Sequence, residues 1–149
     1  MRISDARIEQ VPSIAAMEQR IFSDPWTEAQ IASQLTGEGH VFLTAEENGD
    51  VLGYISAVYV LDEGYIGNVA VAEDCRCRGV GQALVEAMRT RAEVLRLSFL
   101  TLEVRESNGS ARRLYARCGY KDVGLRKNYY EKPRENAVLM TLELNKSCE

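Results

Sequence analysis

The sequence predicts a single α/β (α+β) domain over residues 1–149, in which about seven strands form one mixed, mostly antiparallel sheet flanked by about four helices. Two observations predict this class. Seven short runs rich in β-branched and aromatic residues are interspersed with four stretches of helical apolar spacing. One of these helical stretches lies between two strand-like runs with short loops on both sides, which is typical of parallel neighbouring strands.

The N-terminal quarter predicts one strand and two helices. Residues 2–6 alternate weakly between polar and apolar and are expected to form an edge strand. An amphipathic helix over 12–22 begins at a proline, and residues 23–26 interrupt it. A threonine with a glutamine three positions later then forms a capping box, which opens a short helix over 27–35.

Three strand-like runs follow, at 40–45, 51–61 and 65–71. An Asn-Gly pair at 48–49 lies between the first two and is the strongest short-range signal for a hairpin. A second reversal at 62–64 leads into the third run. We therefore expect an antiparallel meander of three strands.

A helix over 79–95 and a strand over 98–104 come next, and this strand is expected to lie parallel to the strand at 65–71. Ser107 or Asn108 can cap a further helix, which ends at Gly119.

Two runs at 120–125 and 137–144 complete the predicted sheet. Residues 126–136 between them are polar and carry two tyrosines, and we expect them to connect the two strands.

Composition excludes several classes of protein. The net charge of −4 argues against general nucleic-acid binding, for which a basic face is typical, so we expect no direct nucleic-acid partner. No secretory signal and no apolar run long enough for a membrane span occur, so we expect a cytoplasmic protein with no membrane partner. The cysteines have neither disulfide nor zinc spacing, and we expect no bound metal; they are Cys75, Cys77, Cys118 and Cys148.

The loop Arg76-Cys77-Arg78-Gly79-Val80-Gly81 stands between a predicted strand and a predicted helix. Two glycines let the backbone turn sharply, and unpaired N–H groups at a helix start favour a phosphate. A tight turn without a ligand is an equally good interpretation of the loop alone. The loop lacks the third glycine of a Rossmann fingerprint and the Gly-Lys-Ser/Thr of a P-loop.

This loop resembles the Gln/Arg-x-x-Gly-x-Gly/Ala loop by which the GNAT superfamily of N-acetyltransferases holds the pyrophosphate of acetyl-CoA. Within the superfamily the chain resembles the RimI type, which acetylates the N-terminal alanine of a small-subunit ribosomal protein. The resemblance covers nearly the whole chain and implies the GNAT fold, in which the parallel strand pair splays apart. The further matching segments are 68–71, 102–108, Ala111, 114–115, 119–120 and 128–130.

The resemblance implies a set of acetyl-CoA-binding residues. Backbone groups of one strand would pair with the pantetheine arm and polarise the acetyl carbonyl. This sequence has Arg76 where glutamine is common and Cys77 where RimI-type loops often have arginine, which affects the expected phosphate affinity. The implied residues are Val69, Ala70, Val71, Arg76, Cys77, Arg78, Gly79, Val80, Gly81, Gln82, Ala83, Asn108 and Tyr115.

The resemblance also implies catalytic and acceptor-binding residues. Glu103 would be the general base, directly or through water; its alternative role is an ion pair with an arginine. Tyr115 would protonate the departing thiolate; its alternative role is a buried core residue. Trp26, Tyr129 and Tyr130 would border the acceptor groove, or would only pack the helix connection and the last hairpin.

The expected reaction is direct attack of an N-terminal α-amine on acetyl-CoA in a ternary complex. The expected acceptor is the N-terminal alanine of the eighteenth small-subunit ribosomal protein, and the expected assembly is a monomer or weak dimer. Two alternatives stay open. The acceptor could be a small amine such as a polyamine, an aminoglycoside or an amino acid, or the protein could be a CoA-binding sensor without turnover.

Overall fold

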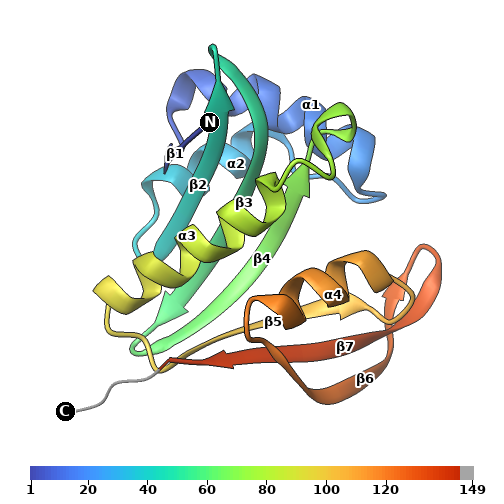
Figure 1. Ribbon diagram of the computed structural model, residues 1–149. Helices are drawn as coiled ribbons and strands as arrows, with labels where there is room; N and C mark the ends of the chain where they lie inside the picture. Colours follow the sequence, from blue (N-terminus) through green and yellow to red (C-terminus); the bar gives the residue numbers. More distant parts are fainter. Residues whose placement is uncertain (145–149) are drawn as a thin grey trace.

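A computed structural model describes residues 1–144 and shows a seven-stranded sheet with helices on both faces (Figure 1). The strand order is β1-β2-β3-β4-β5-β7-β6. Every neighbouring pair is antiparallel except β4 and β5, which confirms the predicted mixed sheet. The strands are β1 (Arg2–Asp5), β2 (His40–Glu47), β3 (Asp50–Val60), β4 (Glu63–Val71), β5 (Phe99–Arg105), β6 (Lys121–Glu131) and β7 (Arg134–Glu143).

Four α-helices cover the sheet, as predicted. They are α1 (Val11–Ile21), α2 (Glu28–Thr36), α3 (Val80–Val94) and α4 (Gly109–Arg117), and short 3-10 turns occupy Ile8–Gln10 and Glu73–Cys75. The predicted capping box opens α2, because the Thr27 hydroxyl accepts from the Gln30 N–H and the Gln30 side chain accepts from the Thr27 N–H. No helix within residues 1–144 is long and apolar enough to cross a membrane.

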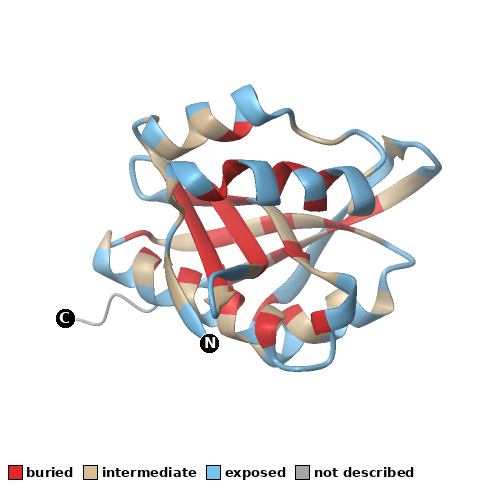
Figure 2. Cartoon of the chain, turned by 90° about the horizontal axis from the view of Figure 1, so that it is seen from above, coloured by how far each residue is buried: buried red, intermediate tan, exposed pale blue. Residues whose placement is uncertain are grey.

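Two apolar layers hold the helices to the sheet. On one face, α3 packs Leu84, Val85 and Met88 against β2, β3 and β4. On the other face, the inner residues of α1 and α2 pack with Phe42 and Tyr54. Figure 2 shows the buried residues gathered where helices meet the sheet and the outer helix faces exposed. Because successive strand residues point to opposite faces, β2 and β3 contribute to both layers.

The parallel pair β4 and β5 is joined only at one end. Its paired residues are Glu63 with Phe99, Gly64 with Leu100, and Tyr65 with Thr101. Beyond this end the two strands are not paired with each other, although each keeps an antiparallel partner on its other side. This confirms the predicted splay, and it leaves backbone groups of both strands facing a gap.

The expected connection over residues 126–136 was wrong. Strand β6 continues to Glu131 and β7 already begins at Arg134, so only two residues form the turn. The alternation that marks a buried strand is missing because β6 is an edge strand with nearly all its side chains exposed. An irregularity between Arg126 and Tyr130 includes Asn128, which has a φ of 54° and whose N–H donates to the Asn136 side chain at 2.9 Å.

Candidate active site

A cavity of about 500 Å³ lies beside the free end of β4, between the head of α3 and α4. The end of α1 closes one side of it with Ile21 and Phe22. It brings together eleven of the thirteen residues predicted to bind acetyl-CoA, whereas Arg78 and Ala83 do not line it. The eleven are Val69, Ala70, Val71, Arg76, Cys77, Gly79, Val80, Gly81, Gln82, Asn108 and Tyr115.

The head of α3 has the geometry of an anion cradle. Gly79 caps the helix with a left-handed φ of 81°, and no side chain occupies the cap. The first N–H groups of a helix have no acceptor within the helix, and the helix dipole adds positive potential there. A Cβ built on Gly79 would meet nothing within 4 Å, so the space above this turn is open. Backbone donors in such an opening fit a diphosphate.

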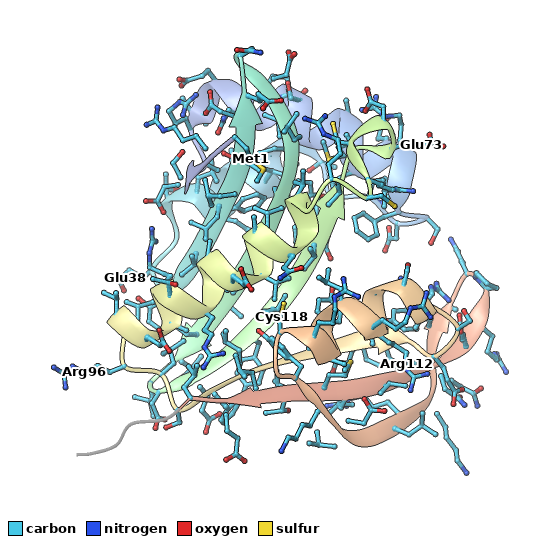
Figure 3. All side chains as sticks on the ribbon, viewed as in Figure 1. Met1, Glu38, Glu73, Arg96, Arg112 and Cys118 are labelled. Atoms are coloured by element: carbon cyan, nitrogen blue, oxygen red, sulfur yellow. The ribbon has the colours of Figure 1, made fainter. Side chains whose placement is uncertain are left out.

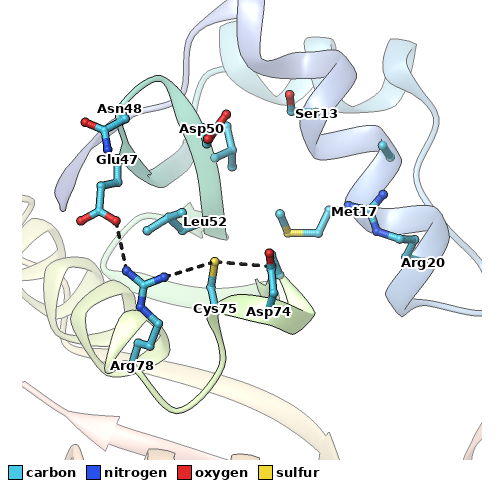
Figure 4. A pocket seen from close by; sticks show the side chains of 13 residues that line it. Ser13, Met17, Arg20, Glu47, Asn48, Asp50, Leu52, Asp74, Cys75 and Arg78 are labelled. Carbon is cyan, nitrogen blue, oxygen red and sulfur yellow. Dashed lines mark hydrogen bonds and ion pairs between the residues drawn. The ribbon is translucent and has the colours of Figure 1, made fainter.

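Two arginines of the loop point to different places. Arg76 lines the cavity and is fixed by its Nε, which donates to the Val71 carbonyl at 3.3 Å. Arg78 turns away into a second cavity of about 490 Å³, where it pairs with Glu47 at 3.0 Å and approaches the Cys75 Sγ at 3.8 Å (Figure 4). Of the two guanidinium groups, only that of Arg76 is available to the cradle in this structure.

Tyr115 lies on α4 with its side chain in the core and against the cavity. Asn108 begins this helix, because its Oδ1 accepts from the Ala111 N–H at 3.2 Å. Tyr115 follows about two turns later and is 8% exposed. Burial raises the pKa of Tyr115 well above its usual value, and the nearby Tyr130 adds to this shift. The phenol therefore keeps its proton through the neutral and mildly alkaline range.

The side chain of Glu103 lies on the face of β5 that points away from Tyr115 and α4. Leu102 and Val104 point into the core with α4, whereas Glu103 lines a separate pocket of about 330 Å³. Its Oε2 pairs with the Arg126 Nε at 3.0 Å. The structure thus contains the ion pair that was the alternative role of Glu103. The carboxylate and the Tyr115 phenol stand on two sides of β5, next to the strand gap.

The tip of the β6–β7 hairpin is fixed by Arg105. Its Nη1 donates to the Pro133 carbonyl at 2.9 Å and to Glu135 at 3.2 Å, and its guanidinium lies 4.2 Å from the centre of the Tyr130 ring. Hydrogen bonds from Ser107 hold the pKa of Glu135 below its usual value. These contacts hold the end of the hairpin beside β5.

The two tyrosines of this hairpin differ in exposure. Tyr130 is partly buried under Arg105, and this burial raises its pKa to about 12. Tyr129 is 47% exposed, and its ring meets that of Tyr130 edge to face at 5.0 Å. Arg126 stands 5.8 Å from the Tyr129 ring, so the hairpin and Glu103 are linked by one side chain.

Trp26 lies on the other side of the strand gap, over β4. A Cβ built on Gly67 would lie 3.6 Å from the outer edge of the indole. The backbone N–H of Trp26 donates to Glu18 Oε1 at 2.9 Å. Sequence reasoning took Glu18 as one position of the amphipathic helix and gave it no role. The signal that could have found it is a glutamate on the same stripe as Ile14 and Ile21.

The cysteines and acidic residues give no metal site among residues 1–144: no three His, Cys, Asp or Glu side chains gather suitably. Cys75, Cys77 and Cys118 are free thiols, and Cys148 lies outside the described residues. Cys118 stands at the end of α4 beside α3 (Figure 3), and burial raises the pKa of its thiol. Burial likewise raises the pKa of Cys75.

Comparisons with known proteins agree on one family. The acetyltransferase (GNAT) family model matches residues 11–120. The ribosomal protein bS18-alanine N-acetyltransferase of Escherichia coli K12 is 34% identical over 145 residues, which cover 96% of this chain and 97% of the relative. The enzyme of the same name from Haemophilus influenzae is 37% identical over 131 residues, with 86% and 88% covered. The crystal structure of the Escherichia coli enzyme has a TM-score of 0.90 at 33% identity, covering 99% and 96% of the two chains.

Proposed function

The chain belongs to the acetyltransferase (GNAT) family, and from this premise we propose that it transfers the acetyl group of acetyl-CoA to the N-terminal α-amine of a protein. The acceptor is the N-terminal alanine of the eighteenth small-subunit ribosomal protein, and the reaction takes place in the cytoplasm. The names of two similar relatives support this acceptor. The observation that carries the proposal is the open anion cradle at the head of α3, next to the gap between β4 and β5.

An N-terminal amine is an easier acceptor than a lysine side chain. At pH 7, removing a proton from a lysine ε-amine costs about 4.6 kcal/mol, whereas an α-amine with a pKa near 8 costs about 1.4 kcal/mol. A single carboxylate is therefore enough to assist the attack. The partly exposed Glu103 fits this modest demand better than a deeply buried base would.

The residues of the cavity fit acetyl-CoA. When bound, acetyl-CoA supplies an activated acetyl group with a thiolate as the leaving group. The N–H groups at the start of α3 and the guanidinium of Arg76 hold the diphosphate. The free backbone of Val69–Val71 donates to the acetyl carbonyl and orients the pantetheine arm as a neighbouring strand would. Asn108 and Ala111 border the arm from α4.

Glu103 takes the proton that leaves the acceptor amine, and Tyr115 supplies a proton to the departing thiolate. Glu103 accepts a proton from the acceptor amine, directly or through one water, while its Oε2 keeps the contact with the Arg126 Nε. Both can occur because a carboxylate has about four lone-pair positions and one guanidinium contact leaves several free. Tyr115 donates its phenolic proton toward the sulfur that leaves. The α1–α2 turn with Trp26 and the hairpin with Tyr129 and Tyr130 form the two walls of the acceptor groove.

The acceptor is tested with purified protein, acetyl-CoA and a peptide that begins Ala-Arg-Tyr. We expect thiol release and a peptide heavier by one acetyl group at its N-terminus. The same peptide with a blocked N-terminus is the control and should give no thiol. Transfer only to a polyamine, an aminoglycoside or an amino acid would replace this acceptor by a small amine. CoA binding without thiol release for any amine would make the protein a sensor.

The cradle is tested by Gly79→Ala. A residue with a Cβ disfavours a φ of 81° by about 1–2 kcal/mol, so the loop leaves the cradle conformation more often. We expect the Kd for CoA, measured by calorimetry, to rise by about tenfold. The matched control is Gly49→Ala, because Gly49 has a φ of 86° and equally open surroundings but lies in the β2–β3 turn. Equal CoA affinity of the two variants would contradict the proposed cradle.

A further inference from the structure

Glu18 is a carboxyl group in the core with three hydrogen-bond donors around it. Its side chain is fully buried, and the described residues supply no cation within ion-pairing distance. Oε1 accepts from the backbone N–H of Trp26 at 2.9 Å, and Oε2 accepts from the Asn68 Nδ2 at 2.8 Å and from the Tyr54 hydroxyl. A buried carboxyl is costly unless such donors satisfy it, so this group needs a reason to be there.

The three donors belong to three different segments, and this one carboxyl accepts a hydrogen bond from each of them. Trp26 lies in the turn between α1 and α2, Tyr54 on β3 and Asn68 on β4. Neither Trp26 nor Asn68 lines the cavity, but both lie beside the part of β4 that leads into it. Asn68 immediately precedes the backbone of Val69–Val71 that lines the cavity, and the Trp26 ring lies over the residue before it, Gly67. One side chain on α1 therefore ties the acceptor wall to the strand that presents the acetyl group.

The backbone at Asn68 depends on side chains for its conformation. The β3–β4 register shifts between Ile55 and Ala57, so the ladder is interrupted opposite Gly67 and Asn68. The Asn68 N–H donates to the Ser56 Oγ at 3.1 Å instead of to a ladder carbonyl. With the ladder absent here, the tie from the Asn68 side chain to Glu18 helps to set how the following residues face the gap.

We propose that Glu18 is a positioning residue for the acceptor: it holds the turn that carries Trp26 at a fixed distance from the acetyl-presenting part of β4. This inference rests on the proposed function, because it assigns the turn to the acceptor side. Glu18 does not line the cavity of the cradle. Its loss therefore affects the use of the acceptor peptide and leaves acetyl-CoA binding intact.

The test uses Glu18→Gln, which keeps the shape of the side chain but turns one acceptor into an NH₂ group that faces donors. We expect the KM for the Ala-Arg-Tyr peptide to rise by about tenfold, the effect of losing one hydrogen bond to a buried partner, with the KM for acetyl-CoA unchanged. The matched control is Tyr54→Phe. It removes a donor from the same carboxyl but leaves the ties to Trp26 and Asn68, so its peptide KM should stay within about twofold of the wild type.

A second readout needs no substrate. Trp26 is the only tryptophan in the chain, so its fluorescence reports this turn alone. We expect acrylamide to quench it more strongly in Glu18→Gln than in Tyr54→Phe. If Glu18→Gln does not fold, Asn68→Ala cuts the same tie from the less buried end and should raise the peptide KM in the same way.

The outcomes separate the inference from the proposed function. Unchanged quenching and unchanged peptide KM in a folded Glu18→Gln protein would overturn the positioning role. Equal rises in the KM for peptide and acetyl-CoA would also overturn it, since they would indicate a general loss of structure. If the wild type acetylates no peptide, the proposed function fails, and the quenching alone then decides whether Glu18 holds the turn.

Discussion

Glu103→Gln is expected to lower the turnover number for the acceptor peptide by about 10²- to 10⁴-fold, the usual contribution of a general base. The amide has nearly the same shape but cannot take a proton from the attacking amine. Glu103 lies outside the cavity of the cradle, so the affinity for acetyl-CoA should not change. The measurements are kcat at saturating peptide and the Kd for CoA by calorimetry.

Arg126→Gln is the control that separates a base from an ion-pair partner. Both variants break the 3.0 Å contact between Arg126 and Glu103, but only Glu103→Gln removes the carboxylate. If Glu103 is the base, Arg126→Gln should keep most of the activity. If Glu103 serves only as an ion-pair partner, the two variants should behave alike. Unchanged turnover in Glu103→Gln would remove Glu103 from the mechanism.

Tyr115→Phe is expected to lower kcat by about 10²-fold, because the departing thiolate loses its proton donor. Burial raises the pKa of Tyr115, so in the wild type its proton is retained as the pH passes the ordinary tyrosine value of about 10. Loss of this proton therefore should not limit wild-type activity below that pH. The measurement is a pH profile of kcat from neutral to the alkaline limit of stability.

The control for this variant is Tyr120→Phe. The ring of Tyr120 is 5.9 Å from that of Tyr115 and is also buried, and within residues 1–144 its hydroxyl has no hydrogen-bond partner. It does not line the cavity, so its loss should leave kcat near that of the wild type. Wild-type activity of Tyr115→Phe over the whole profile would reject the acid role.

Local chemistry made much of the fold predictable. The Asn-Gly turn at 48–49 and the capping box at Thr27 are set by neighbouring residues, and the structure contains both. The extension of β6 was missed because an exposed edge strand has no buried face to impose alternation on its sequence. The end of β6 is held by the backbone of β7 and by Arg105, which lies 28 positions before the Pro133 carbonyl that it binds.

In the candidate site, too, features set by neighbouring residues could be predicted and features set by distant contacts could not. The loop at the head of α3 is a contiguous stretch of sequence, so its resemblance to the GNAT loop was enough to predict a phosphate-binding role for it. The direction of the Arg78 side chain could not be predicted in this way, because it is set by an ion pair with Glu47 at the end of β2, away from the cavity. The partner of Glu103 and the three donors to Glu18 also come from segments that meet only after the sheet and helices pack. Such contacts leave no periodic signal in the sequence.

The short pairing between β4 and β5 has a mechanical consequence. Backbone hydrogen bonds join the first four strands to the last three only at the end that holds Glu63 and Phe99. The two half-sheets thus form two arms that are joined at one end and separate at the other, and the cavity lies near the separated end. An extended molecule that bonds to both arms replaces the missing rungs. Occupancy of the gap and the resistance of the whole chain to unfolding are therefore coupled.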